Sequence, residues 1–246
     1  MRPKKPTPRY THIADIIELS PHLRRFILSG DGLKDFPVGK EGSYVKLLLA
    51  QADGSEMIKR SYTIRSFNPD TNELALDFVV NCHEGPATLW AKQAKVGDNV
   101  MIAGPGPLKM TDYQQSSYLL VGDITAVNAV NGYVPRFSKD ADVRAVVSVP
   151  TRSDIIEMDY DDSHNTVWFV EDEAQTTLEQ TVTETAKNMA NNTHVFLGIE
   201  AGHVRSLKPI LQDELGFDRL NIFAVGYWKR GVDADRFGAQ KRANPL

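Results

Sequence analysis

The chain has 246 residues, with 28 Lys and Arg against 32 Asp and Glu, so its formal net charge is −4. A charge this close to zero argues against a protein built mainly to coat nucleic acid. The single cysteine, Cys82, excludes an internal disulfide and any metal centre built from several cysteines.

The first hundred residues show the pattern of a series of short strands. Turn residues such as Asn68-Pro69-Asp70 and Gly104-Pro105-Gly106-Pro107 separate strand-length segments of mixed polarity. One helix interrupts the series at 85–91, where Pro86 falls in the first turn. Many short strands with turns between them favour a barrel or a sandwich. The predicted strands are 11–18, 22–28, Tyr44–Ala50, Arg60–Arg65, Glu73–Val80 and Val100–Ala103.

The rest of the chain alternates strands with helices, which predicts a parallel sheet covered by helices. We place the domain boundary within Lys109–Ser117 and divide the chain into domains 1–112 and 113–246. The predicted strands are Tyr118–Val121, Val143–Val149, Val167–Val170, Val195–Ile199 and Asn221–Val225. The predicted helices are Thr125–Phe137, Gln175–Asn188 and Val204–Leu215.

Charge is distributed unevenly between the two halves. Residues 1–110 hold 15 Lys and Arg against 12 Asp and Glu, whereas residues 111–246 hold 13 against 20. The net charges are therefore +3 and −7. The basic first half is the part better suited to bind an anionic ligand.

A barrel followed by a parallel α/β domain often carries a flavin on the barrel and a pyridine nucleotide on the sheet. The segment Arg60-Ser61-Tyr62-Thr63 lies on a predicted strand, so Arg60 and Tyr62 share one face and Ser61 and Thr63 the other. An arginine there can pair with a flavin pyrophosphate through two parallel hydrogen bonds, and Tyr62 offers a flat, amphipathic ring. An ordinary barrel strand with a surface arginine explains the same four residues.

A second segment leads from a strand through a Gly-Pro turn into a helix. Backbone N–H groups at such a helix start suit a pyrophosphate, and Thr88 adds a hydroxyl. A plain helix start after a strand is the alternative. The candidate flavin-binding residues of this segment are Asp77, Phe78, Val79, Val80, Gly85, Pro86, Ala87 and Thr88.

The RSYT and GPAT segments, taken with four others in the same order, make the chain resemble the siderophore-interacting protein family. These are FAD-binding ferric-siderophore reductases related to ferredoxin–NADP reductases. The matching positions are Arg60, Tyr62, Thr63 and Arg65; Asp77, Phe78, Val79, residues 85–88, Trp90 and Ala91; Gly97, Asp98, Gly104 and Pro105; and the stretches 122–129, 198–207 and 227–231.

The resemblance implies an antiparallel six-stranded flavin-binding β-barrel, a ferredoxin reductase-like α/β domain, and electron transfer through FAD to Fe(III) held by a siderophore, which releases Fe(II). It adds Thr125 to the residues around FAD, and because many ferric siderophores are anionic it implies a basic substrate pocket. The candidate substrate-binding residues are Lys46, Lys109, Lys229 and Arg230. No side chain of the protein is needed as an iron ligand, and the histidine spacing predicts no metal site.

The sequence departs from the family pattern at several positions. The family histidine after DFV is Asn81 here, with His83 two residues on; Ile124 and Asn128 replace the Glu and Pro of the GDETALPA-like turn. The second domain has no Gly-rich phosphate loop, and Asp123 puts negative charge where a nucleotide phosphate would lie. We therefore leave NADH, NADPH and reduced ferredoxin open as electron donors.

Two other functions stay open at this stage. A general NAD(P)H reductase of the ferredoxin or flavodoxin type would carry a Gly-rich loop after Val121, where the chain has GDITAVN. A non-catalytic siderophore-binding protein would have lost its flavin segments. Neither a secretory signal nor an apolar run near the ~18 residues of a membrane helix is present, so we expect a cytoplasmic monomer with no membrane span and no nucleic-acid partner.

Overall fold

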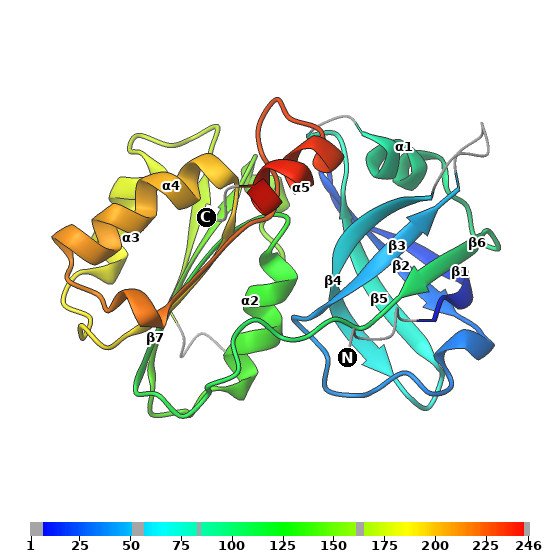
Figure 1. Cartoon of the computed structure of the whole chain (residues 1–246), viewed down its shortest axis with the longest axis horizontal. Coiled ribbons are helices and arrows are strands. Elements are labelled where there is room, and N and C mark those ends of the chain that lie inside the picture. The colour runs from blue at the N-terminus through cyan, green and yellow to red at the C-terminus, as the bar shows by residue number, and fades with distance from the viewer. Residues whose placement is uncertain (1–6, 51–56, 83–84, 161–164, 244–246) are drawn as a thin grey trace. The chain divides into compact units, whose positions relative to one another are not determined.

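A computed structural model describes residues 7–50, 57–82, 85–160 and 165–243, and the chain forms two compact units, Met1–Leu108 and Lys109–Leu246. The sequence-based division after residue 112 falls just beyond this boundary. Figure 1 shows the first unit as β-strands with one helix and the second as a sheet flanked by helices. The prediction of a barrel followed by a parallel α/β domain is confirmed.

Six antiparallel strands close the barrel in the order β1-β2-β5-β4-β3-β6. Strand β3 shows why the segment closes this way, because Val45, Leu47 and Leu49 are buried inside while Lys46 between them is exposed. Helix α1, Pro86–Gln93, covers one end of the barrel through its buried alanines (Figure 1). The strands are β1 Arg9–Ser20, β2 Leu23–Ser29, β3 Tyr44–Leu49, β4 Ile58–Asn68, β5 Glu73–Val79 and β6 Asn99–Ala103.

The second unit contains a parallel five-stranded sheet in the order β11-β10-β7-β8-β9. After β7 the chain builds outward on one side through β8 and β9 and then returns to β7's other side with β10 and β11. The strand order therefore reverses between β7 and β10, and ligands of open α/β sheets bind outside the carboxyl ends of the strands at such a point. The strands are β7 Ser117–Asp123, β8 Asp142–Val149, β9 Asn165–Val170, β10 His194–Ile199 and β11 Ile222–Gly226.

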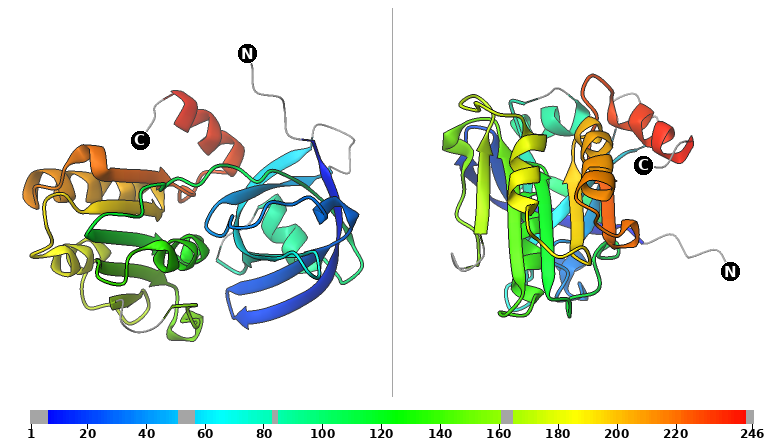
Figure 2. Two further views of the ribbon diagram at one scale, coloured as in Figure 1. Left: turned by 90° about the horizontal axis from the view of Figure 1, so that it is seen from below. Right: turned by 90° about the vertical axis from the view of Figure 1, so that its left-hand side faces the viewer.

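Helices cover both faces of this sheet (Figure 2). Helices α3, Leu178–Ala186, and α4, Ala201–Pro209, pack on the face that carries Leu197. Helix α2, Val127–Tyr133, packs on the other face, where the Tyr133 and Phe196 rings meet edge to face with centroids 5.2 Å apart. Helix α4 continues into a π-helical turn, Ile210–Glu214.

The last helix, α5 at Ala234–Ala243, was not predicted from the sequence. Its segment is strongly polar, and Phe237 is its only residue buried in the structure, so the chain shows no apolar periodicity there. The predicted helices at Thr125–Phe137 and Val204–Leu215 also have different bounds from α2 and α4. None of the helices in the described residues is long and apolar enough to span a lipid bilayer.

Candidate functional site

The pairing of β3 with β4 fixes which way the RSYT segment faces. Arg60 lies opposite Leu47 and Tyr62 opposite Val45, and both partners are fully buried. Paired residues of an antiparallel ladder share a face, so Arg60 and Tyr62 lie together on the core side of this sheet. Ser61 is exposed on the other face. The two-residue alternation predicted from the sequence is therefore present in the ladder.

An aromatic cluster joins the two candidate flavin segments. The Tyr62 ring stacks on Phe78 of β5 with centroids 3.9 Å apart and an interplanar angle of 27°. Phe78 in turn contacts Trp90 of α1 at 5.3 Å and Phe26 of β2 at 4.7 Å. Segments that are separate in the sequence are thus fixed side by side at one end of the barrel.

Stacking on Phe78 has two consequences for Tyr62. One face of the ring is covered by Phe78, so a ligand could meet only the other face or the edge. Burial raises the pKa of the Tyr62 phenol, although the nearby positive charge of Arg60 works in the opposite direction. The phenol therefore stays neutral at physiological pH and is able to donate a hydrogen bond.

The carboxylate of Asp77, a predicted flavin residue, is held inside the barrel wall. Asp77 and Arg25 are opposite each other in the β2–β5 ladder, and Arg25 donates to both carboxylate oxygens, at 2.7 and 2.8 Å. The Asp77 side chain is 1% exposed and that of Arg25 is 19% exposed. With both of its oxygens engaged by a guanidinium, Asp77 joins β2 to β5.

The strand–turn–helix segment has the shape that its sequence predicts. Helix α1 begins at Pro86, and Ala87 and Thr88 are buried in its first turn. A Cβ placed on Gly85 would meet no atom within 4 Å, so open space lies directly beside this turn. Val79 and Val80 are buried ahead of the turn.

Asn81 has a left-handed backbone, φ 62°, and its amide donates to the Pro21 carbonyl at 2.9 Å. His83, the alternative to the family histidine two residues further on, lies outside the described residues.

The donors of these residues are of a chemistry that fits FAD. Arg60 could supply a guanidinium to a pyrophosphate, Ser61 has an exposed hydroxyl and Tyr62 a neutral phenol, and the open space beside Gly85 leaves room for a bulky group at the start of α1. Lys46 is opposite Ser61 in the ladder and exposed on the same outer face. Among the described residues, no three His, Cys, Asp or Glu side chains gather closely enough to bind a metal ion.

The second unit places a buried carboxylate where the strand order of its sheet reverses. Asp123, the last residue of β7, accepts hydrogen bonds from the Thr125 N–H at 2.9 Å and from the Thr125 hydroxyl. Its other oxygen accepts from the Glu200 N–H at 3.1 Å and from the Trp228 indole at 2.8 Å. Burial raises the pKa of Asp123, and these hydrogen bonds oppose the rise. Thr125, predicted to lie near FAD, has its hydroxyl directed to Asp123.

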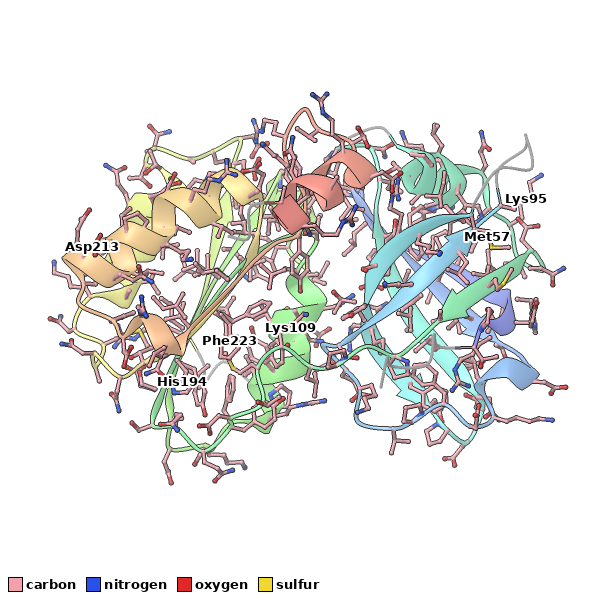
Figure 3. All side chains as sticks on the ribbon, viewed as in Figure 1. Met57, Lys95, Lys109, His194, Asp213 and Phe223 are labelled. Atoms are coloured by element: carbon pink, nitrogen blue, oxygen red, sulfur yellow. The ribbon has the colours of Figure 1, made fainter. Side chains whose placement is uncertain are left out.

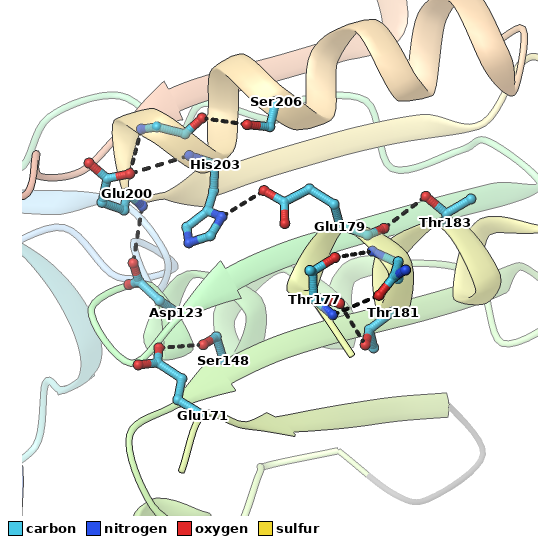
Figure 4. Close-up of polar contacts among 12 residues, drawn as sticks. Asp123, Ser148, Glu171, Thr177, Glu179, Thr181, Thr183, Glu200, His203 and Ser206 are labelled. Carbon is cyan, nitrogen blue, oxygen red and sulfur yellow. Dashed lines mark hydrogen bonds and ion pairs between the residues drawn. The ribbon is translucent and has the colours of Figure 1, made fainter. Parts of the chain in front are cut away.

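A second carboxylate, Glu200, follows the neighbouring strand β10. One oxygen accepts from the Gly202 and His203 N–H groups at the start of α4, and the other accepts from the Arg230 N–H at 3.0 Å. Figure 4 shows Glu200 between Asp123 and the first turn of α4, where His203 also contacts Glu179 at 2.8 Å. This turn is therefore already capped by a carboxylate of the chain itself.

The predicted substrate cations of this unit lie around the end of β11 and around α2. Lys109 is exposed beside α2 (Figure 3), and its N–H donates to the Tyr133 hydroxyl at 3.1 Å. Lys229 is half-buried and its ammonium donates to Gln240 of α5 at 3.1 Å. Arg230 is exposed at a turn that Gly231 completes with φ 70°.

The contacts of three residues of this unit were not predicted from the sequence. Lys241 on α5 donates to the Gly226 carbonyl at 3.1 Å, and burial together with the charge of Lys109 lowers its pKa. It was missed because α5 itself was not predicted. Glu200 has a recognisable signal, an acidic residue between a buried strand and the small residues of a helix start. Trp228 has none, since its partner Asp123 is 105 residues away.

Comparisons with known proteins match nearly the whole chain. The model of the siderophore-interacting FAD-binding domain matches residues 12–57 and 50–108, and that of the siderophore-interacting protein matches residues 115–231. The ferric vibriobactin reductase ViuB of Vibrio cholerae is 25% identical over 255 residues, which cover 94% of both chains. The crystal structure of the siderophore-interacting protein SipS from Aeromonas hydrophila is similar with a TM-score of 0.85 at 28% identity, covering 98% of both chains. The ferredoxin reductase of carbazole 1,9a-dioxygenase shares the fold, with a TM-score of 0.73 at 17% identity over 90% of this chain and 68% of that one.

Proposed function

The chain belongs to the siderophore-interacting protein family and is a flavin-dependent reductase, and we propose that it passes electrons from NAD(P)H or reduced ferredoxin through FAD to siderophore-bound Fe(III). The observation that carries this proposal is the aromatic cluster of Tyr62, Phe78 and Trp90, which joins the two candidate flavin segments in one barrel. FAD, when bound, supplies the ability to accept a pair of electrons and release them singly.

The barrel's own residues would hold and orient this group. The Arg60 guanidinium would pair with the pyrophosphate, and the first turn of α1 beside Gly85 would add backbone N–H groups. Tyr62, fixed by its stacking on Phe78, would contact the cofactor with its free face or edge. Asp77 would act indirectly, because its pair with Arg25 holds β2 against β5.

The proposed substrate is an anionic ferric siderophore, held by cationic side chains. Lys46 on the barrel and Lys109, Lys229 and Arg230 on the second unit are the residues we propose for this contact. Iron is the substrate and arrives with its own ligands. Reduction to Fe(II) weakens its attraction to hard oxygen ligands, which favours release.

The carboxyl ends of the parallel strands in the second unit affect which electron donor can bind. In open α/β sheets a dinucleotide's pyrophosphate lies at a helix start beside the point where the strand order reverses. Here Glu200 already accepts from the N–H groups at the start of α4, and Asp123 is buried next to it. We therefore expect NADH and NADPH to bind weakly at this place. A protein such as ferredoxin is then the better electron donor.

Anaerobic stopped-flow with the purified protein tests the proposal. We expect the protein to take up FAD with a flavin absorption spectrum, and the reduced form to be reoxidised by a ferric siderophore while a chromogenic chelator captures two Fe(II) per flavin. Protein that takes up no FAD would overturn the assignment as a flavoenzyme. Reduced protein that passes electrons to ferredoxin or flavodoxin but not to ferric siderophores would identify a general reductase instead.

A further inference from the structure

We propose that Asp123 and Glu200 are positioning residues, which fix the backbone of the loop 227–232 so that Arg230 is presented to the substrate. This inference rests on the proposed function in one respect, the role of Arg230 as a cation for an anionic ferric chelate. The anchoring of the loop itself depends only on hydrogen bonds within the second unit. Neither carboxylate belongs to the residues predicted to bind FAD or siderophore.

Each residue at the start of the loop is tied to a neighbouring strand end. The Tyr227 N–H donates to the Ile199 carbonyl at 3.0 Å, and the Trp228 carbonyl accepts from the Ala201 N–H at 2.9 Å. The Trp228 indole donates to Asp123 and the Arg230 N–H donates to Glu200. The loop is thus held from β7 by the Asp123 carboxylate, and from the end of β10 by two backbone hydrogen bonds and the Glu200 carboxylate.

The two carboxylates act as one unit. Asp123 is 5% exposed and Glu200 is 8% exposed, so neither can exchange these partners readily for water. A single oxygen of Asp123 accepts from both the Glu200 N–H and the Trp228 indole, which links the β7 end, the β10 end and the loop at one atom. Loss of either carboxylate would leave buried N–H groups without an acceptor.

Glu200 divides its oxygens between two tasks. Oε2 caps α4 through the Gly202 and His203 N–H groups, whereas Oε1 accepts only from Arg230 among the described residues. A helix cap needs one acceptor, so capping alone does not account for the second contact. The contact to Arg230 is the one that reaches the loop.

The tip of the loop is shaped to expose the cation. A turn closes between Lys229 and Val232, whose N–H donates back to the Lys229 carbonyl at 3.1 Å, and Gly231 provides the positive φ that the turn requires. Within the described residues, the Arg230 guanidinium has no hydrogen-bond partner and is exposed. A free cation on a fixed backbone loses little conformational entropy when it binds an anion.

Two conservative variants separate loop anchoring from general stability. Glu200→Gln keeps one oxygen, which can cap α4 or accept from Arg230 but serves both only poorly. Trp228→Phe removes the indole donor to Asp123 and keeps an aromatic ring. Glu179→Gln is the matched control, because it makes the same carboxylate-to-amide change beside His203 without reaching the loop.

The direct readout is amide exchange and NMR on the FAD-loaded protein. We expect the Arg230 amide to exchange ~10-fold faster or more in Glu200→Gln and Trp228→Phe, and at the native rate in Glu179→Gln. Three indole N–H signals are expected from three tryptophans, and Glu200→Gln should move the one that Trp228→Phe deletes. Unchanged Arg230 exchange in both loop variants would overturn the anchoring.

The kinetic readout is a double-mutant cycle with an anionic and a neutral ferric chelate. We expect Glu200→Gln and Arg230→Ala each to raise KM for the anionic chelate about 3- to 10-fold with kcat within twofold, and the double variant to match Arg230→Ala alone. Fully additive effects would refute the positioning role. If Arg230→Ala leaves KM unchanged while ferric reduction persists, Arg230 has no substrate contact for the carboxylates to position. That outcome would overturn the positioning role and spare the reductase assignment.

Discussion

Replacing Asp77 by alanine tests whether this residue serves the barrel or the flavin. The carboxylate accepts two charge-assisted hydrogen bonds from Arg25, at 2.7 and 2.8 Å, and is 1% exposed. Removing one partner of a buried ion pair costs ~3–5 kcal/mol because the other charge is left uncompensated. Arg25 keeps 19% exposure, so water offsets part of the loss and we expect about 3 kcal/mol.

Urea unfolding of the apoprotein, followed by circular dichroism, measures this change, and a nearby pair supplies the control. Glu18 pairs with Arg24 at 2.6 Å across β1 and β2, but Glu18 is 62% exposed. Glu18→Ala should therefore cost less than ~1 kcal/mol. An Asp77→Ala loss as small as that of Glu18→Ala would refute the idea that this pair supports the barrel.

Flavin affinity then separates the two roles of Asp77. A buried ion pair can often be replaced by apolar residues of similar volume without loss of stability. The double variant Arg25→Met with Asp77→Leu should recover most of the stability and retain FAD with near-native affinity. If it folds stably and yet fails to bind FAD, this pair contacts the cofactor directly.

Three further predictions concern the proposed ligands and the buried carboxylate. Arg60→Ala should weaken FAD binding roughly 10- to 100-fold, since a charge-assisted phosphate contact contributes ~1.5–3 kcal/mol; titration should show no such effect for Lys59→Ala on the opposite strand face. Lys46→Ala should raise KM for an anionic ferric siderophore about 2- to 5-fold at low salt while FAD stays bound, and a KM independent of ionic strength in both proteins would exclude Lys46 from the pocket. Because folding raises the pKa of Asp123, this residue adds to the free energy of unfolding at low pH. The contribution is complete below the ordinary pKa of 3.8 and is lost as pH rises through the pKa of the folded state. The unfolding free energy of Asp123→Asn relative to the parent should therefore increase between pH 4 and 8, and a constant difference would contradict the burial argument.

Local patterns were sufficient to predict the strands and which residues of the candidate flavin segment share a face. Alternation along β4 placed Arg60 and Tyr62 together because the period of a strand is a geometric property of the backbone. The helix start at Pro86 was also predictable from local sequence, because proline fixes the backbone angle φ at its own position to a value that suits the first turn of a helix. Helix α5 was missed because Phe237 is its only buried residue, so contacts from outside the helix stabilise it rather than a periodic apolar face.

Hydrogen-bond and ion-pair partners that are far apart in the sequence could not be predicted from it. The Asp77 carboxylate meets Arg25 only because β2 pairs with β5 in one register, and a single-residue slip would separate them. Asp123 meets Glu200 and Trp228 because three parallel strands end at the same edge. In the sequence, the only visible sign of this network is that Asp123 and Glu200 each follow a buried strand.

Two of the acidic residues that contribute to the net charge of −7 in the second half of the chain are buried where the parallel strands end. An excess of acidic residues spread over a surface would only repel anions weakly, because salt screens exposed charges. Asp123 and Glu200 are buried, so their influence is screened much less, and Glu200 already fills the start of α4. A nucleotide pyrophosphate at this place would have to displace a helix cap worth about 1 kcal/mol and approach a second buried carboxylate. Reduction of the flavin by ferredoxin at rates above those with NADH and NADPH is the result that this arrangement favours.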